Sequence, residues 1–214
     1  MMIPVSEARR LIDENCRGSR GEVLRLIDAL DTALSSDVLS PIDTPPFHQS
    51  AVDGYAFSFA AWNKKAGLEV IGEVQAGNVF TQAISASQAV RIFTGAPVPP
   101  GLDTVVMQEK VEVRDNMMFI KDELLVSGAN VRLQGSQTKT GDVVLKKGHR
   151  MTPASISFLA SLGITEVPVF AQPHIRIIVT GKELVPPGGT ISGGQIFESN
   201  SFALKTALKA MAIS

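Results

Sequence analysis

The chain has 214 residues, of which 44% are hydrophobic and 19% charged, so it can bury a sizeable core and is not a disordered protein. Its formal net charge is −1 without a basic tail, which excludes electrostatically driven binding of nucleic acid. Its one cysteine, Cys16, allows no internal disulfide, and no apolar run is long enough to cross a bilayer. We therefore expect a cytoplasmic protein with no nucleic-acid or membrane partner.

The N-terminal part of the chain predicts two helices followed by an extended segment. Ser6 is a favourable N-cap, and the apolar residues that follow it have helical spacing. After a break over 17–21, the apolar spacing of Gly21–Leu30 predicts a second short helix. Ser35–Pro46 is rich in proline and is predicted to be extended.

Short β-like runs separated by Gly, Pro, Asn and Asp dominate from about Ala51 to Arg132. The predicted strands are Glu69–Val74, Ala89–Ile92, Thr104–Gln108, Glu109–Val113 and Met117–Ile120. The pair Asp115-Asn116, between the last two runs, is typical of a hairpin turn. This part of the chain is predicted to be a small, mostly-β barrel or sandwich.

The next stretch predicts a strand, a helix and another strand. Val143–Leu145 is a short β-like run. Thr152 before Pro153 predicts a helix start, and Gly163 predicts its end. Ile164–Phe170 is predicted to be a strand.

The C-terminal part predicts the opening of a doubly wound α/β domain. His174–Thr180 is the strongest strand prediction in the chain, because a nearly continuous apolar stretch is typical of a central parallel strand. A glycine-rich loop follows, and Ser199 or Asn200 then caps a predicted helix. The order strand, loop, helix indicates an α/β architecture.

Several stretches combine glycine with isolated acidic or hydroxyl residues: Ser50–Ala56, Thr94–Pro99, Gly141-Asp142, Thr180–Leu184 and Glu198–Asn200. Carboxylates and hydroxyls on glycine-rich loops suit a hard cation such as Mg²⁺, and amides freed by glycine suit anions such as phosphate or molybdate. Any one of these stretches, taken alone, is more typical of a structural turn, and no spacing fits a P-loop or a dinucleotide-binding fingerprint. The residues alone therefore indicate an anion site with a divalent metal.

The order of these stretches resembles the molybdopterin molybdenumtransferase family, which includes the C-terminal domain of gephyrin. The family patterns SAMDGYA, TGAPVP, LAS-x-G, TG-D-EL and I-x-x-SN correspond in order to Ser50–Ala56, Thr94–Pro99, Leu159–Gly163, Thr180–Leu184 and Ile196–Asn200. Each match is short, but together they run in the family's order along most of the chain.

The resemblance implies a reaction, in which the intact protein inserts molybdate into adenylylated molybdopterin, forms molybdenum cofactor and releases AMP with the help of Mg²⁺. It implies catalytic carboxylates at Asp53 and Glu183, and metal ligands at Asp53 and Asp142. The residues that it implies for binding substrate or an anion are Thr94, Gly95, Ala96, Ser199 and Asn200. It also implies a homodimer.

The resemblance also implies a domain arrangement. Residues 1–16 would form a helix that packs on the α/β domain, and 17–40 with 136–168 an elongated linker domain. The β module would cover 41–135, and 169–214 would be the start of a truncated α/β molybdopterin-binding domain. The chain would then be the N-terminal half of its protein, and we expect residues 1–214 alone to be inactive.

Two departures from the family pattern leave an alternative open. Ser136 and Gln137 stand where the family has two acids, and Lys182 replaces an aspartate. The loss of negative charge favours a non-catalytic, gephyrin-like scaffold or a family member that has lost activity. A lysine near an anionic substrate could instead bind phosphate.

Overall fold

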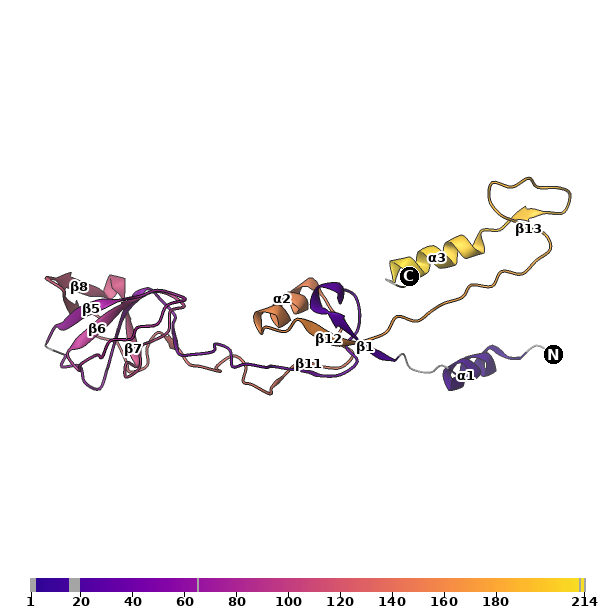
Figure 1. Cartoon of the computed structure of the whole chain (residues 1–214). Coiled ribbons are helices and arrows are strands. Elements are labelled where there is room, and N and C mark those ends of the chain that lie inside the picture. The colour runs from indigo at the N-terminus through magenta and orange to yellow at the C-terminus, as the bar shows by residue number, and fades with distance from the viewer. Residues whose placement is uncertain (1–2, 16–19, 65, 212, 214) are drawn as a thin grey trace. The chain divides into compact units, whose positions relative to one another are not determined.

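The computed structural model describes residues 3–15, 20–64, 66–211 and 213, so Cys16 lies outside the described residues. The chain divides into two compact units (Figure 1). One, which we call the sheet unit, is Leu39–Val144, and the other, the two-segment unit, joins Met1–Val38 with Leu145–Ser214. Among the described residues, no helix combines the length and the apolar character needed to span a membrane.

The sheet unit is built on six strands in the order β7-β4-β6-β5-β9-β8. Their bounds are Gly54–Phe57 (β4), Leu68–Val74 (β5), Gln88–Ile92 (β6), Thr104–Met107 (β7), Val111–Arg114 (β8) and Met117–Ile120 (β9). The sheet is mixed, because β5 and β6 pair in parallel while the other neighbours pair antiparallel. The predicted mostly-β character of this region is thereby confirmed.

Both faces of this sheet are buried. Successive side chains of a strand point to opposite faces, so Ala89 and Val90 belong to two different core clusters. One cluster comprises Ala56, Val74, Val90, Ile92, Ala96 and Val105. The other comprises Phe57, Leu68, Ala89, Val106, Met118 and Leu125. This double burial holds the strands rigidly and therefore also the loops at their ends.

The predicted strands lie within one or two residues of the observed ones, with two differences. β4 was not predicted, because glycine in its motif indicated a loop. Glu109 was predicted to begin a strand, but it lies in the 3-10 helix η2, Gln108–Lys110. The hairpin between β8 and β9 is confirmed, with left-handed φ angles of 48° at Asp115 and 63° at Asn116.

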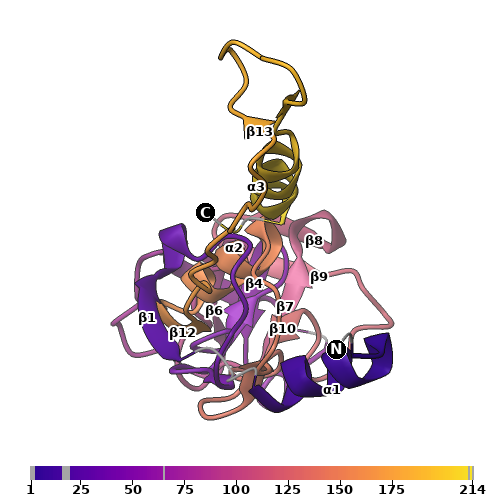
Figure 2. The same cartoon turned by 90° about the vertical axis from the view of Figure 1, so that its right-hand side faces the viewer.

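The predicted helix over Gly21–Leu30 is wrong. Gly21–Arg25 forms strand β1, which pairs antiparallel with β12, Glu166–Phe170, and a 3-10 turn η1 follows over Leu26–Asp28 (Figure 2). The apolar spacing suited either structure, and pairing with a strand about 145 residues away decided it. The periodicity of a single segment does not reveal a pairing partner so far away in the sequence.

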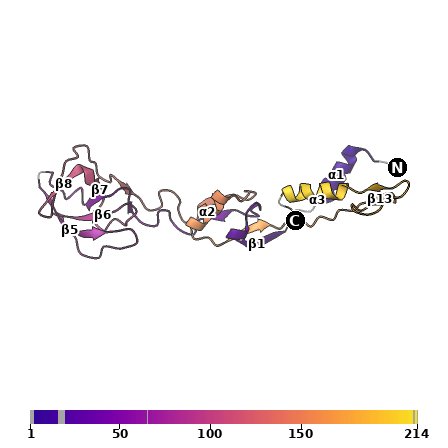
Figure 3. The same ribbon diagram turned by 90° about the horizontal axis from the view of Figure 1, so that it is seen from above.

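Two helices of the two-segment unit occur where they were predicted. α1 spans Val5–Asn15, and α2 spans Pro153–Ser161 and contacts the 3-10 turn η1; both helices are labelled in Figure 3. At the start of α2 the Thr152 hydroxyl accepts from the Ser155 amide at 3.2 Å, and the Ser155 hydroxyl accepts from the Thr152 amide at 2.7 Å. This reciprocal capping box satisfies two amides that the helix itself leaves unpaired.

The predicted central strand over His174–Thr180 is wrong, because the structure has no strand there. Within the described part of the chain no strand pairs with this segment, and Ile178 is 77% exposed. A strand forms only with a hydrogen-bonded neighbour, so an apolar sequence is not sufficient. The chain continues into a two-residue parallel pair, β13 (Leu184–Val185) with β14 (Ile196–Phe197). Helix α3 (Asn200–Ala210) follows, which confirms the helix predicted to begin at Ser199 or Asn200.

Four two- and three-residue strands complete the fold: β2 (Val38–Leu39), β3 (Gln49–Ser50), β10 (Val131–Arg132) and β11 (Val143–Leu145). They form the pairs β2–β11 and β3–β10. The predicted strand over Val143–Leu145 is thus confirmed as β11.

Asp43 ties together segments of the sheet unit that are far apart in sequence. Its Oδ1 accepts from the Thr140 amide at 2.9 Å and hydroxyl at 3.1 Å, and its Oδ2 accepts from the Gln134 side-chain amide at 3.0 Å. These hydrogen bonds, led by the Thr140 amide and helped by Lys139, lower the pKa of Asp43 below its usual value. Because the folded-state pKa is the lower one, the stabilisation is present above the unfolded pKa of about 3.9 and is lost as the pH falls through the folded value.

We therefore expect Asp43→Asn to lower the melting temperature by about 3 °C at pH 7 and by less at pH 3. The measurement is thermal unfolding followed by circular dichroism at both pH values. Glu123→Gln is the matched control, since within the described chain Glu123 makes no hydrogen bond and the substitution removes the same charge. An equal fall at pH 7 and pH 3 would contradict a role for the ionised carboxylate.

Candidate functional site

Two of the predicted motif residues, Asp53 and Thr94, meet at one edge of the sheet. Asp53 immediately precedes β4, and Thr94 comes two residues after the end of β6. Because β4 and β6 are antiparallel neighbours, the start of one lies beside the end of the other. Oδ1 of Asp53 accepts hydrogen bonds from both the amide and the hydroxyl of Thr94, each at 2.7 Å. The structure thus brings together two residues that are 41 positions apart.

Three further side chains surround Asp53, and none was among the predicted site residues. Arg91 donates from Nη1 to the Gly54 carbonyl at 3.2 Å and from Nη2 to Oε1 of Gln108. Gln108 donates from Nε2 to Oε1 of Glu109 at 3.0 Å, and its backbone amide donates to the Asp53 carbonyl at 3.1 Å. We call Asp53, Arg91, Thr94, Gln108 and Glu109 the Asp53 cluster.

One sequence signal pointed to Arg91. It stands between Val90 and Ile92, which are fully buried in β6, and a charged residue within a buried strand needs a dedicated set of partners. Gln108 had no such signal, because its placement depends on how β7 runs beside β4.

The electrostatics of the cluster favour a cation. The hydroxyl and amide of Thr94 lower the pKa of Asp53, and the charge of Arg91 contributes in the same direction. The pKa of Glu109 is also lowered, first by its hydrogen bond from Gln108, although the charge of Asp53 opposes this. Both carboxylates are therefore ionised at neutral pH, and with one guanidinium the three groups carry a net charge of −1.

The amides that were predicted to bind an anion donate to the protein itself. The Thr94 amide donates to Asp53, the Gly95 amide to the Ser50 carbonyl at 2.9 Å, and the Ala96 amide to the Phe93 carbonyl at 3.0 Å. An anion at Thr94–Ala96 would have to displace these bonds. The geometry gives Thr94 a different function, which is to orient the Asp53 carboxylate.

Asp142 has a local structural role. Its Oδ2 accepts from the Lys139 amide at 2.8 Å, and its own amide donates to the Lys139 carbonyl at 3.0 Å, which closes the turn before β11. Among the residues that the structure describes, no group of three or more His, Cys, Asp or Glu side chains converges as a metal centre. A metal held by Asp53 and Asp142 stays a prediction.

The remaining predicted residues belong to the two-segment unit. Glu183 is exposed, and its carbonyl accepts from the Ile196 amide at 2.8 Å, which joins β13 to β14. Ser199 is the N-cap of α3, as predicted, but its side chain makes no capping bond. Glu198 does so instead, because its two carboxylate oxygens accept from the amide and the hydroxyl of Ser201, each at 2.6 Å. Asn200 is the first residue of the helix.

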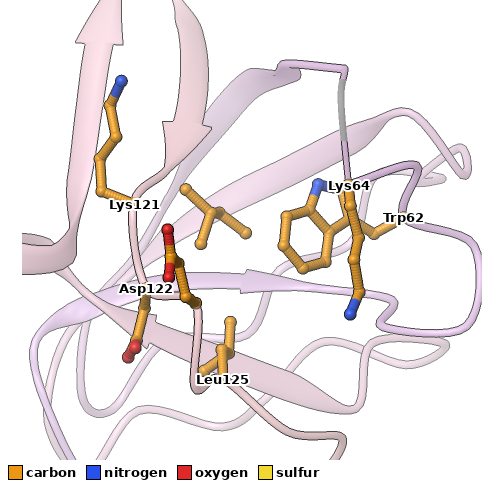
Figure 4. Close-up of a pocket in the computed structure, with 7 residues that line it drawn as sticks. Trp62, Lys64, Lys121, Asp122 and Leu125 are labelled. Carbon is orange, nitrogen blue, oxygen red and sulfur yellow. The ribbon is translucent and has the colours of Figure 1, made fainter.

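A cavity of about 350 Å³ in the sheet unit is lined by Trp62 and Lys64 and by residues from the end of β9 onward, between Ile120 and Leu125 (Figure 4). Trp62 and Asp122 lie on opposite sides of it, and Lys121 is directed away from its centre. Lys121 pairs with Glu112 at 3.0 Å, and the Trp62 ring packs edge-on against Phe57 with centroids 5.5 Å apart. Because its charged groups do not converge and no motif residue lines it, we do not assign the site there.

The mixed sheet, with Asp53 and Thr94 at the ends of neighbouring strands, is accompanied by similarity to a known protein family. The family described as the MoeA N-terminal region (domain I and II) matches residues 3–163, about three quarters of the chain. The chain belongs to this family, which confirms the resemblance seen in its motifs.

Relatives of known name extend this result. Molybdopterin molybdenumtransferase of Haemophilus influenzae is 37% identical over 209 residues, which are 97% of this chain and 52% of that protein. Molybdopterin molybdenumtransferase 2 of Mycobacterium tuberculosis (strain ATCC 25618 / H37Rv) is 34% identical over 213 residues, again 97% of this chain and 52% of that protein. The chain thus spans about half the length of these curated relatives.

Solved structures agree. Two crystal structures of the molybdopterin biosynthesis MoeA protein from Pyrococcus horikoshii match with TM-scores of 0.88 and 0.82, at 31% and 32% identity. They cover 100% and 98% of this chain, and 56% and 57% of their own chains. The fold is therefore MoeA-like over its whole described extent.

Proposed function

We propose that the protein to which this chain belongs is a molybdopterin molybdenumtransferase, which inserts molybdate into adenylylated molybdopterin, forms molybdenum cofactor and releases AMP. The observation that carries the proposal is the 37% identity, across nearly the whole chain, with the Haemophilus influenzae protein of that name. The Asp53 cluster supports it, because it offers two ionised carboxylates on a rigid sheet edge.

Asp53 is the proposed catalytic carboxylate and the first ligand for Mg²⁺. Its Oδ1 is occupied by Thr94, while Oδ2 accepts no hydrogen bond within the part of the chain that the structure describes. Mg²⁺ prefers oxygen ligands and commonly takes one or two carboxylates together with substrate phosphates, so the donors fit the ion. When bound, the ion would neutralise negative charge on the substrate. Asp142 is the proposed second ligand, and Thr94 the proposed residue that orients the Asp53 carboxylate.

We further propose that residues 169–214 begin an α/β molybdopterin-binding domain, in which Glu183 is catalytic and Ser199 and Asn200 contact substrate. The support is that a MoeA structure matches this chain over its full length, including this segment. We also propose that the protein functions as a homodimer in the cytoplasm.

The proposed function is tested with the full-length protein, adenylylated molybdopterin, molybdate and Mg²⁺. The expected result is molybdate-dependent release of AMP, together with cofactor that activates a molybdenum-free apo-enzyme. Omission of molybdate and removal of Mg²⁺ with EDTA are the controls. Residues 1–214 alone are expected to be inactive. A folded full-length protein that releases no AMP would contradict the proposal.

Ser136, Gln137 and Lys182 support a second candidate, a non-catalytic scaffold, because they lower the negative charge relative to the family pattern. The same assay separates the two functions. A scaffold would be folded and oligomeric, but it would release no AMP at any concentration of molybdate or Mg²⁺.

We expect Glu183→Ala to lower the rate of molybdenum insertion more than Lys182→Ala does. Both side chains are exposed neighbours before β13, so each substitution perturbs packing little and serves as the control for the other. The family pattern TG-D-EL has its glutamate at the position of Glu183, whereas Lys182 departs from that pattern. Greater loss with Lys182→Ala would reverse the two assignments.

A further inference from the structure

We infer that Arg91 is a positioning residue, which acts through Gln108 to hold the Glu109 carboxylate beside Asp53. The inference deepens the proposed function and rests on it wherever turnover is concerned. The geometry itself does not depend on that function.

The guanidinium of Arg91 is held on several sides. Its central carbon lies 5.0 Å from the centroid of the Tyr55 ring and 5.1 Å from that of the Phe93 ring. It also donates to the Gly54 carbonyl at 3.2 Å and to the side-chain oxygen of Gln108. Because the guanidinium group lies against two aromatic rings, it has little freedom to move. Its two hydrogen-bond acceptors are therefore fixed relative to each other.

These two acceptors belong to different segments of the site. Gly54 directly follows Asp53 at the start of β4, and Gln108 is the first residue of η2. A second bond joins the same segments, since the Gln108 amide donates to the Asp53 carbonyl at 3.1 Å. Arg91 therefore connects the two backbone segments that carry the carboxylates of Asp53 and Glu109.

Gln108 transmits this placement to Glu109. A side-chain amide has one oxygen and one NH₂ group, so binding of its oxygen to Arg91 directs the NH₂ group the other way. There Nε2 donates to Oε1 of Glu109 at 3.0 Å. Glu109 is exposed, and an exposed glutamate without such a partner samples several rotamers.

A lysine at position 91 would keep the positive charge but not this arrangement. Its ammonium group is a point charge on a flexible stem, and it lacks the planar, rigid set of donors with which arginine binds two acceptors while it contacts aromatic rings. Arg91→Lys therefore separates the effect of charge from that of geometry. Gln108→Leu removes the connection to Glu109 without changing any charge.

The first test measures the position of Glu109 directly in the 214-residue chain. Side-chain scalar couplings measured by NMR report whether Glu109 occupies one χ1 rotamer or an average of several. We expect one rotamer in the wild type and averaging in Arg91→Lys and in Gln108→Leu. Arg114→Lys is the matched control, because Arg114 pairs with Glu112 on β8 of the same unit. An averaged Glu109 in the wild type, or a fixed one in both variants, would overturn the inference.

The second test measures turnover in the full-length protein. We expect Arg91→Lys and Gln108→Leu each to lower kcat about 10-fold with little change in KM, since a misplaced group affects the reaction more than binding. The double variant should be no worse than either single one, because both break the same connection. Unchanged kcat in variants whose Glu109 is averaged would refute a role in the reaction. An inactive wild type would refute the proposed function instead, while the NMR result would still decide the placement.

Discussion

Asp53→Asn is expected to lower the rate of molybdenum insertion by the full-length protein roughly 100-fold or more, without loss of the fold. Asparagine keeps an oxygen in the place of Oδ1, so the amide and hydroxyl of Thr94 retain their acceptor. What is lost is the negative charge, which a hard dication or a cationic reaction partner needs.

The measurement is AMP release under saturating molybdate and Mg²⁺, with the melting temperature recorded for the same preparation. Asp115→Asn is the control, because it removes one charge from an exposed turn of the same unit and asparagine is favoured in such turns. If Asp53→Asn turned over as fast as this control, Asp53 would have no catalytic function.

Gly54→Ala is expected to destabilise the sheet unit by about 3 kcal/mol. A Cβ at position 54 would lie 1.9 Å from the carbonyl oxygen of Val106, so β4 and β7 would have to separate. The sequence Asp53-Gly54 is therefore needed for close approach of two strands, in addition to any function of the carboxylate.

Unfolding of the sheet unit can be followed specifically, since the only tryptophan, Trp62, packs on Phe57 at the end of β4. We expect the urea midpoint of Trp62 fluorescence to fall markedly in Gly54→Ala. Gly193→Ala is the control, because a Cβ there meets no atom within 4 Å and its φ is not in the left-handed region. Equal midpoints in the two variants would show that the sheet accommodates the methyl group.

Several features followed directly from local sequence because their causes are local. The capping box of Thr152 and Ser155 involves residues three apart, and the hairpin at Asp115-Asn116 depends on two residues that tolerate left-handed φ. The strands of the sheet unit alternate between two buried faces, which leaves apolar runs that are easily recognised. The family was also identified from the sequence, since the order of its motifs is a property of the chain alone.

The Asp53 cluster shows the limit of local reasoning. Asp53 and Thr94 stood out because glycine accompanies them, but Arg91, Gln108 and Glu109 join them only through strand pairing across the sheet. Strand β4 was missed for a related reason. Its Gly54 was interpreted as a sign of a loop, whereas it permits close contact between two strands. Which polar groups face one another is decided by register, and register involves residues dozens of positions apart.

Sequence patterns were enough to identify the family, most strands of the sheet unit, helices α1, α2 and α3, and the Asp53 and Thr94 motifs. Tertiary structure alone decided that Gly21–Arg25 is a strand, because β12 pairs with it, and that His174–Thr180 is not, because no strand in the described chain lies beside it. A helix satisfies its backbone hydrogen bonds within its own sequence, whereas a strand must find them in another segment. Strand formation is therefore a property of the pair, and periodicity in one segment cannot establish it.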